Sequence, residues 1–122
     1  MNAADAAPVV LIVDDDPSLA RMLRVLLTSD GFDVMVAHNG REALDSLRDA
    51  RPSLVILDLQ MPVMDGRTFF KELKRTEYHC PVIILSAYNA EAARKELGAE
   101  AALAKPFDPD AISLLVRETL KE

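Results

Sequence analysis

A chain of 122 residues has the size of one domain and can bury one hydrophobic core, so we expect a single domain over residues 1–122. The net charge of −6 argues against direct contact with nucleic acid, which needs gathered Lys and Arg side chains, and no apolar run is long enough to cross a membrane. The single cysteine, Cys80, excludes an internal disulfide and, with no secretory signal pattern before the first strand, predicts a cytoplasmic location.

Strands and helices are predicted to alternate along the chain. Residues 1–7 are rich in alanine without periodicity and are expected to be flexible, whereas residues 9–13 form a continuous apolar run of strand length. From Pro17 onward, apolar residues recur at helical spacing until Gly31 ends the helix. The same alternation occurs four more times. The further strands and helices are expected at residues 34–37 and 40–50, 54–57 and 67–76, 82–85 and 89–97, and 101–104 and 109–120.

This alternation predicts an α/β fold with a parallel sheet. Strands of near-continuous aliphatic residues are typical of a sheet that is covered by helices on both faces and joined by right-handed crossovers. In such a sheet the carboxyl ends of all strands meet at one edge, where functional groups collect. The polar residues that follow or end the predicted strands are Asp14, Asp15, Asp16, Asp58, Ser86 and Lys105.

These residue types at one edge indicate phosphoryl chemistry. Crowded carboxylates repel one another unless a cation lies among them, and a hard divalent ion bound by oxygen atoms, above all Mg²⁺, is the natural partner. A carboxylate nucleophile, a lysine ammonium group and a serine hydroxyl would complete a site that accepts a phosphoryl group and neutralises its charge. The expected product is an aspartyl phosphate at Asp58.

Four short motifs carry a family resemblance. They are Val13-Asp14-Asp15-Asp16-Pro17, Asp58 with Met61-Pro62 and Asp65-Gly66, Ser86-Ala87, and Lys105-Pro106-Phe107. Together and in this order, over nearly the whole chain from Val9 to Leu120, they resemble the receiver domain of two-component response regulators. The resemblance implies a CheY-like, flavodoxin-like (βα)5 three-layer sandwich, in which the five-stranded parallel sheet has the order 2-1-3-4-5.

The resemblance also implies roles for the acidic residues. Asp58 would accept the phosphoryl group from a histidine kinase or a histidine phosphotransfer protein. Asp15 would bind Mg²⁺ directly, and Asp14 would assist through water or hydrogen bonds. Asp58 itself and the backbone carbonyl of Gln60 would be the remaining protein ligands, and Mn²⁺ would be a substitute metal.

The two other site residues are expected to read the modification. By the same resemblance, Lys105 would contact the phosphoryl group and Ser86 would turn its hydroxyl toward it. The change would then reach the surface made by residues 89–97, 101–104 and 109–120, which would control a downstream protein target or an output domain missing from this chain. Catalysis would be limited to the chain's own phosphoryl transfer and hydrolysis, so it is not expected to be an enzyme, and it would be a monomer or a weak dimer.

Two alternatives stay open beside this interpretation. A small phosphatase of the haloacid dehalogenase type also uses an Asp nucleophile, a Ser, a Lys and Mg²⁺, but it usually has a second Asp two residues later as general acid. Gln60 stands at that position, and an amide cannot donate and recover a proton. The second alternative lies within the family: the chain is either a stand-alone receiver or a receiver excised from a larger regulator.

The sequence departs from the usual receiver pattern in three ways. Ala102 stands where the family often has an aromatic switch residue, which makes Tyr88 the nearest candidate for that part. The spacing from Ser86 to Lys105 is short by roughly one helical turn, so the fourth helix or its entry loop is expected to be shortened and the familiar dimer is in doubt. Gln60 and Tyr88 would flank the phosphoryl group, which predicts a long-lived modification.

Two further acidic residues are given local structural roles. Asp16 precedes Pro17 at a helix start, where a carboxylate caps backbone N–H groups, so it is not counted as a metal ligand. Asp65 with Gly66 is interpreted as turn chemistry that aims the loop after Asp58.

Overall fold

The computed structural model describes residues 7–61, 63–76 and 79–121 of the chain. The expected flexibility of residues 1–7 therefore concerns, apart from Ala7, residues outside these ranges. Five parallel strands form one sheet in the order β2-β1-β3-β4-β5, as predicted. The elements are β1 (Val9–Val13), α1 (Pro17–Ser29), β2 (Asp33–Ala37), α2 (Gly40–Ser46), β3 (Leu54–Asp58), α3 (Gly66–Arg75), β4 (Val82–Ser86), α4 (Ala90–Leu97), β5 (Ala101–Ala104) and α5 (Pro109–Leu120).

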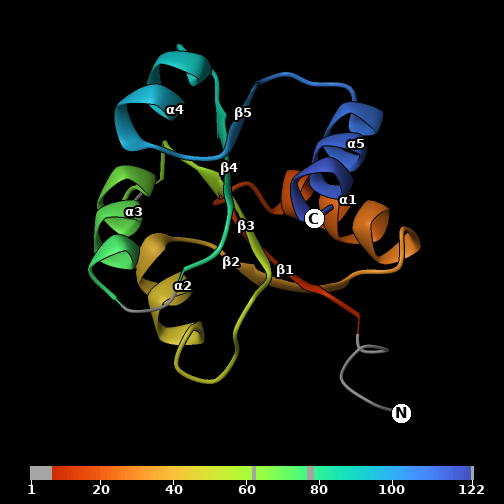
Figure 1. Cartoon of the computed structure of the whole chain (residues 1–122), viewed down its shortest axis with the longest axis horizontal. Coiled ribbons are helices and arrows are strands. Elements are labelled where there is room, and N and C mark those ends of the chain that lie inside the picture. The colour runs from red at the N-terminus through yellow and green to blue at the C-terminus, as the bar shows by residue number, and fades with distance from the viewer. Residues whose placement is uncertain (1–6, 62, 77–78, 122) are drawn as a thin grey trace.

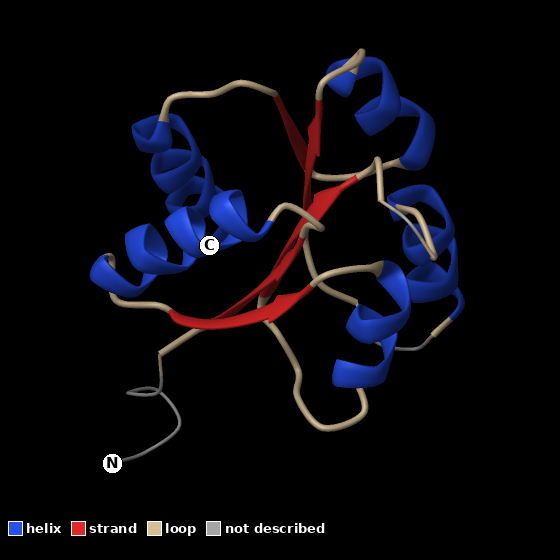
Figure 2. Ribbon diagram, turned by 180° about the vertical axis from the view of Figure 1, so that it is seen from behind, coloured by secondary structure: helices blue, strands red, loops and turns tan. Residues whose placement is uncertain are grey.

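Helices cover both faces of the sheet and give the three layers that the sequence predicts. Figures 1 and 2 show α1 and α5 together on one face and α2, α3 and α4 on the other. Alternate strand side chains enter two separate cores: Ile12 and Ile56 pack toward α1 and α5, while Leu11 and Leu57 pack toward α2 and α3. Because β3 lies in the middle and is buried along its whole length, it is a rigid base for its last residue, Asp58. None of the described helices is long and apolar enough to cross a membrane.

The helix predicted over residues 40–50 is shorter in the structure, because α2 ends at Ser46. The N–H groups of Arg48 and Asp49 bond to carbonyls three residues earlier, those of Asp45 and Ser46, at 3.2 and 3.3 Å. Such bonds tighten the last turn of a helix into a 3₁₀ form. The apolar spacing continues past the point where the backbone changes, which is why the sequence pattern overestimated the length.

The helices α1 and α4 differ in how their N-termini are capped. The carboxylate of Asp16 accepts the N–H groups of Ser18 at 2.9 Å and Leu19 at 3.3 Å, which confirms its predicted capping role. At the start of α4, by contrast, Asn89 has a left-handed backbone (φ 44°) and its side chain makes no capping bond. The first turn of α4 is therefore held less firmly than the first turn of α1.

A polar triad joins the end of α1 to the middle of α5. The hydroxyl of the buried Ser113 donates a hydrogen bond to the carboxylate of Asp30, which is the C-cap residue of α1. Arg117 donates to the Ser113 hydroxyl at 2.9 Å and lies 3.6 Å from the Asp30 carboxylate. Each of these three side chains thus has two polar partners, and the two helices are fixed against each other.

Val63 has an unfavourable backbone conformation, with φ 67° and a side chain that is 83% exposed. A β-branched residue in the left-handed region costs about 1–2 kcal/mol, and the exposed side chain regains little by packing. We expect Val63→Gly to raise the free energy of unfolding by about 1 kcal/mol, measured by urea denaturation. Val25→Gly, at an equally apolar exposed position inside α1, is the matched control and should lower it. A loss of stability in Val63→Gly would contradict the strain argument.

Candidate functional site

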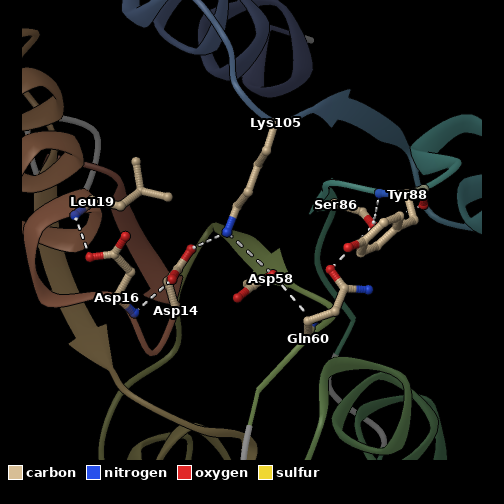
Figure 3. A network of polar contacts seen from close by, with 8 residues as sticks. All are labelled: Asp14, Asp16, Leu19, Asp58, Gln60, Ser86, Tyr88 and Lys105. Carbon is tan, nitrogen blue, oxygen red and sulfur yellow. Dashed lines mark hydrogen bonds and ion pairs between the residues drawn. The ribbon is translucent and has the colours of Figure 1, made fainter.

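The carboxyl ends of β1, β3, β4 and β5 bring four of the predicted residues together (Figure 3). Asp14 directly follows β1, Asp58 and Ser86 are the last residues of β3 and β4, and Lys105 directly follows β5. The parallel register sets this alignment, since Val13 pairs with Leu57. Asp14 and Ser86 are fully buried, and Asp58 is 3% exposed. The predicted convergence of these residues at one edge is therefore present in the structure.

Three carboxylates form a cluster that could hold a metal ion. Oxygen atoms of Asp14, Asp15 and Asp58 lie within 4.8 Å of one another, and Asp15 is the exposed member. The Lys105 ammonium group lies 3.2 Å from Asp14 Oδ2 and 3.4 Å from Asp58 Oδ1. The cluster thus has one cation already, and three carboxylates keep it negative. Hard oxygen donors of this kind suit Mg²⁺, so the residues present fit the expected ion.

The pKa values reflect this crowding of charges. Burial, followed by the neighbouring Asp14 carboxylate, raises the pKa of Asp58 from 3.8 to about 6, although Lys105 and the Gln60 N–H act in the opposite direction. Burial alone would lower the pKa of Lys105. The carboxylates of Asp14 and Asp58 outweigh that effect, so the pKa of Lys105 is raised. The lysine is therefore charged at neutral pH, and the Asp58 carboxyl keeps its proton to a higher pH than an ordinary aspartic acid.

Backbone groups orient the two buried carboxylates. The N–H of Asp16 donates to Asp14 Oδ1 at 2.9 Å, and the N–H of Gln60 donates to Asp58 Oδ1 at 3.2 Å. Both bonds span two residues and arise from the sharp turn that follows each strand. They hold the acids in place, and metal ligation by the Gln60 carbonyl stays a prediction.

Ser86 belongs to the site, but its hydroxyl is engaged elsewhere. Its Oγ donates to the carbonyl of Tyr88 at 2.9 Å and accepts the Tyr88 N–H at 3.1 Å, as Figure 3 shows for the N–H contact. The amide oxygen of Gln60 lies 3.4 Å from the same Oγ. Because a hydroxyl has one proton, Ser86 donates mainly to the closer acceptor, the Tyr88 carbonyl, and only weakly to the Gln60 amide oxygen. A turn of Ser86 toward Asp58 would have to break this local ring.

The residues at which the sequence departs from the usual receiver pattern lie on and around α4 and β5. Tyr88 is 73% exposed beside Ser86, and Ala102 is half-buried on β5. The helix α4 has eight residues. No contact described here tests whether Tyr88 takes the part of the missing aromatic, or whether Gln60 and Tyr88 shield a phosphoryl group, so both stay predictions.

The interpretation of Asp65 and Gly66 needs correction. Asp65 is the N-cap of α3, and its carboxylate accepts the N–H of Thr68 at 2.9 Å, which lowers the pKa of Asp65. Gly66 is needed for space, because an added Cβ would overlap the carbonyl oxygen of Asp58 and would lie 2.7 Å from the Cα of Leu59. The pair therefore packs the start of α3 onto the acidic strand end. Sequence reasoning missed this close approach, and the only signal was the glycine itself.

The fold and the site together define a class of protein. A parallel sheet in the order 2-1-3-4-5, with an acidic cluster, a serine and a lysine at its carboxyl edge, is the arrangement of CheY-like receiver domains. Residues 10–117 match the family model described as the response regulator receiver domain. The chain therefore belongs to the response regulator receiver domain family, which distinguishes it from the phosphatase alternative.

Relatives and solved structures agree with this membership. The chain is 40% identical over 115 residues to the regulatory protein AtoC of Escherichia coli K12, covering 92% of this chain and 25% of AtoC. It is 39% identical to the DNA-binding response regulator MtrA of Mycolicibacterium smegmatis, covering 92% of this chain and 50% of MtrA. The receiver domain of the Francisella response regulator 1452 superposes with a TM-score of 0.86 at 32% identity, covering 93% and 97% of the two chains. The chain thus spans a quarter to a half of these two curated relatives.

Proposed function

We propose that the protein accepts a phosphoryl group on Asp58, from the phosphohistidine of a histidine kinase or histidine phosphotransfer protein. The observation that carries the proposal is the position of Asp58: a buried carboxylate 3.4 Å from the Lys105 ammonium group and within 4.8 Å of the Asp14 and Asp15 carboxylates. Family membership supports the reaction class, and the residues support the acceptor.

The step is a transfer between an imidazole nitrogen and a carboxylate oxygen. An oxygen of Asp58 forms a bond to phosphorus while the bond from phosphorus to the donor's imidazole nitrogen breaks, and the imidazole leaves with the electron pair. Mg²⁺ held by Asp14, Asp15, Asp58 and the Gln60 carbonyl, or Mn²⁺ in its place, would neutralise charge on the phosphoryl oxygens. The Lys105 ammonium group, 3.2 Å from Asp14 Oδ2 and 3.4 Å from Asp58 Oδ1, would hold a further phosphoryl oxygen through a charge-assisted hydrogen bond.

Phosphorylation would act by changing the conformation of the chain, which would not act enzymatically on other substrates. After phosphorylation, Ser86 would leave the ring it forms with Tyr88 and donate its hydroxyl to the phosphoryl group. The surface of α4, β5 and α5 would then control a partner protein or an output domain. MtrA, a longer relative, is named a DNA-binding response regulator, and the net charge of −6 favours an indirect link to DNA for this chain. We further propose a cytoplasmic protein that is monomeric or weakly dimeric.

Incubation with acetyl phosphate tests the acceptor directly. We expect intact-mass analysis to detect one phosphoryl adduct on the wild type, dependent on Mg²⁺, and none on Asp58→Asn, because an amide oxygen is a far weaker nucleophile. Asp16→Asn is the control, because it makes the same change at the residue that follows Asp15 and caps α1. Asparagine caps a helix as well as aspartate does, so this variant should still be modified.

Two results would contradict the assignment. A phosphoryl adduct on Asp58→Asn would place the acceptor at another residue. A wild type that gains no adduct at any Mg²⁺ concentration, either from acetyl phosphate or from a purified phosphorylated histidine phosphotransfer domain, would overturn the proposed function.

A further inference from the structure

The turn between β2 and α2, residues 37–40, bonds to the segments that follow β1 and β3 without contributing a side chain to the acidic cluster. At its first residue, the carbonyl of Ala37 accepts the N–H of Asp14 at 3.0 Å. At its last residue, the N–H of Gly40 donates to the carbonyl of Met64 at 3.0 Å. Met64 lies after β3, and the described residues between Asp58 and Gly66, residues 59–61 and 63–65, are called here the acceptor loop. One short turn therefore links the segment after β1 to the segment after β3.

The turn itself is held firmly. The side chain of Asn39 accepts the N–H of Glu42 at 2.9 Å, and the carboxylate of Glu42 accepts the N–H of His38 at 2.9 Å. These reciprocal bonds resemble a capping box and fix the path of the chain into α2. Ala37 is 1% exposed, and Gly40 is buried. The distance between the two ends of the turn is thus set by short-range bonds.

Gly40 is required at the contact because of space. A Cβ at this position would lie 2.8 Å from Met64 Cγ and 2.9 Å from both Met64 Sδ and the Met64 carbonyl oxygen, closer than real Cβ atoms come. The backbone of Gly40 is not in the left-handed region, so conformational freedom does not explain the residue. Because one of the three close atoms belongs to the backbone, any side chain at position 40 must change the distance between the start of α2 and the acceptor loop.

We propose that residues 37–40 position the metal site, with Gly40 as the residue that sets the acceptor loop at the right distance from Asp14. The proposal rests on the proposed function, since it assumes a metal held between Asp14, Asp15 and the acceptor loop. Mg²⁺ demands near-ideal octahedral geometry, so a small shift of Gln60 or Asp58 relative to Asp14 weakens its binding. Mutation of groups that hydrogen-bond to metal ligands typically changes metal affinity by 10–100-fold, and in this turn the Ala37 carbonyl accepts the N–H of Asp14.

Gly40→Ala tests this role. We expect its Mg²⁺ affinity, measured by isothermal titration calorimetry, to fall about tenfold, and the amide of Gln60 to exchange faster with solvent in the metal-free protein. Gly31→Ala is the matched control. Gly31 precedes the opposite end of β2, has φ 99°, and leaves open space around an added Cβ, so the substitution strains the backbone away from the site. It should lower stability toward urea and leave Mg²⁺ affinity and Gln60 exchange unchanged.

Several outcomes would overturn the proposal. Unchanged Mg²⁺ affinity in Gly40→Ala would contradict the positioning role, and an equal loss of affinity in Gly31→Ala would mean that the effect is general destabilisation.

If Gly40→Ala does not fold, Asn39→Ala is the second variant, because it keeps the glycine and removes the cap of α2. A clear loss of Mg²⁺ affinity in Asn39→Ala supports the proposal, and wild-type affinity contradicts it. A wild type that binds no Mg²⁺ would overturn the proposed function together with this inference, whereas a normal wild type with unaffected variants would overturn this inference alone.

Discussion

Asp58→Asn is expected to raise the free energy of unfolding by about 3 kcal/mol near pH 7.5 in the absence of divalent metal. In the folded protein burial and the Asp14 carboxylate raise the pKa of Asp58 to about 6, while the unfolded chain has the usual value of 3.8. Above the folded pKa the buried carboxylate is charged, and this ionisation lowers the free energy of unfolding. An asparagine of nearly the same shape carries no charge and avoids this destabilisation.

The pH dependence gives the sign of the effect. Between about pH 4 and pH 6 the folded protein holds a proton on Asp58 that the unfolded chain has released, so stability falls as the pH rises through this window. The difference between Asp58→Asn and the wild type should therefore vanish below about pH 4, grow up to about pH 6 and stay level above it. Urea denaturation of both proteins across this range, in EDTA, measures it.

A control and a metal titration sharpen this prediction. At Asp65 the Thr68 N–H lowers the pKa, so Asp65→Asn should not stabilise the protein at neutral pH. Added Mg²⁺ should stabilise the wild type, because a ligand that binds only the folded state adds to its stability. The difference in free energy of unfolding between Asp58→Asn and the wild type should then become smaller. A constant difference between Asp58→Asn and wild type from pH 4 to 8 would contradict the assigned cause.

Gly66→Ala is expected to lower the free energy of unfolding by about 3 kcal/mol, the upper end of the cost of overpacking. The added Cβ would overlap the carbonyl oxygen of Asp58 and approach the Cα of Leu59 to 2.7 Å. Both are backbone atoms of a buried segment, so they cannot rotate away. The start of α3 would have to move, which weakens the bond from the Gly66 N–H to the Leu59 carbonyl, now 3.1 Å long.

The same substitution at Gly98 separates overlap from backbone strain. Gly98 ends α4 with φ 78° and has open space around an added Cβ, so Gly98→Ala should cost only about 1 kcal/mol. In urea denaturation, the free energy of unfolding of Gly66→Ala should be well below that of Gly98→Ala. Equal losses would mean that α3 accommodates the methyl group and that the close packing against Asp58 is not required.

The sequence was sufficient to predict the sheet and the meeting of the site residues. Runs such as Leu54 to Leu57 are apolar without interruption, which specifies a strand covered on both faces, and parallel strands place Asp58 and Lys105 at one edge. Other features depend on contacts between distant segments. Nothing local to Gly40 or Gly66 indicates which backbone each must approach, and the hydroxyl direction of Ser86 depends on the path of the chain at Tyr88.

The triad of Asp30, Ser113 and Arg117 has a mechanical consequence for the whole molecule. It joins α1 to α5 through the buried Ser113 hydroxyl and its two polar partners. Among the described residues, α4 starts without a side-chain cap, and its ion pair with α3, Arg67 with Glu96, is exposed and of the kind that contributes at most about 1 kcal/mol. Under the proposed function, a change that starts at the sheet edge is therefore expected to alter the uncapped first turn of α4 more readily than α5.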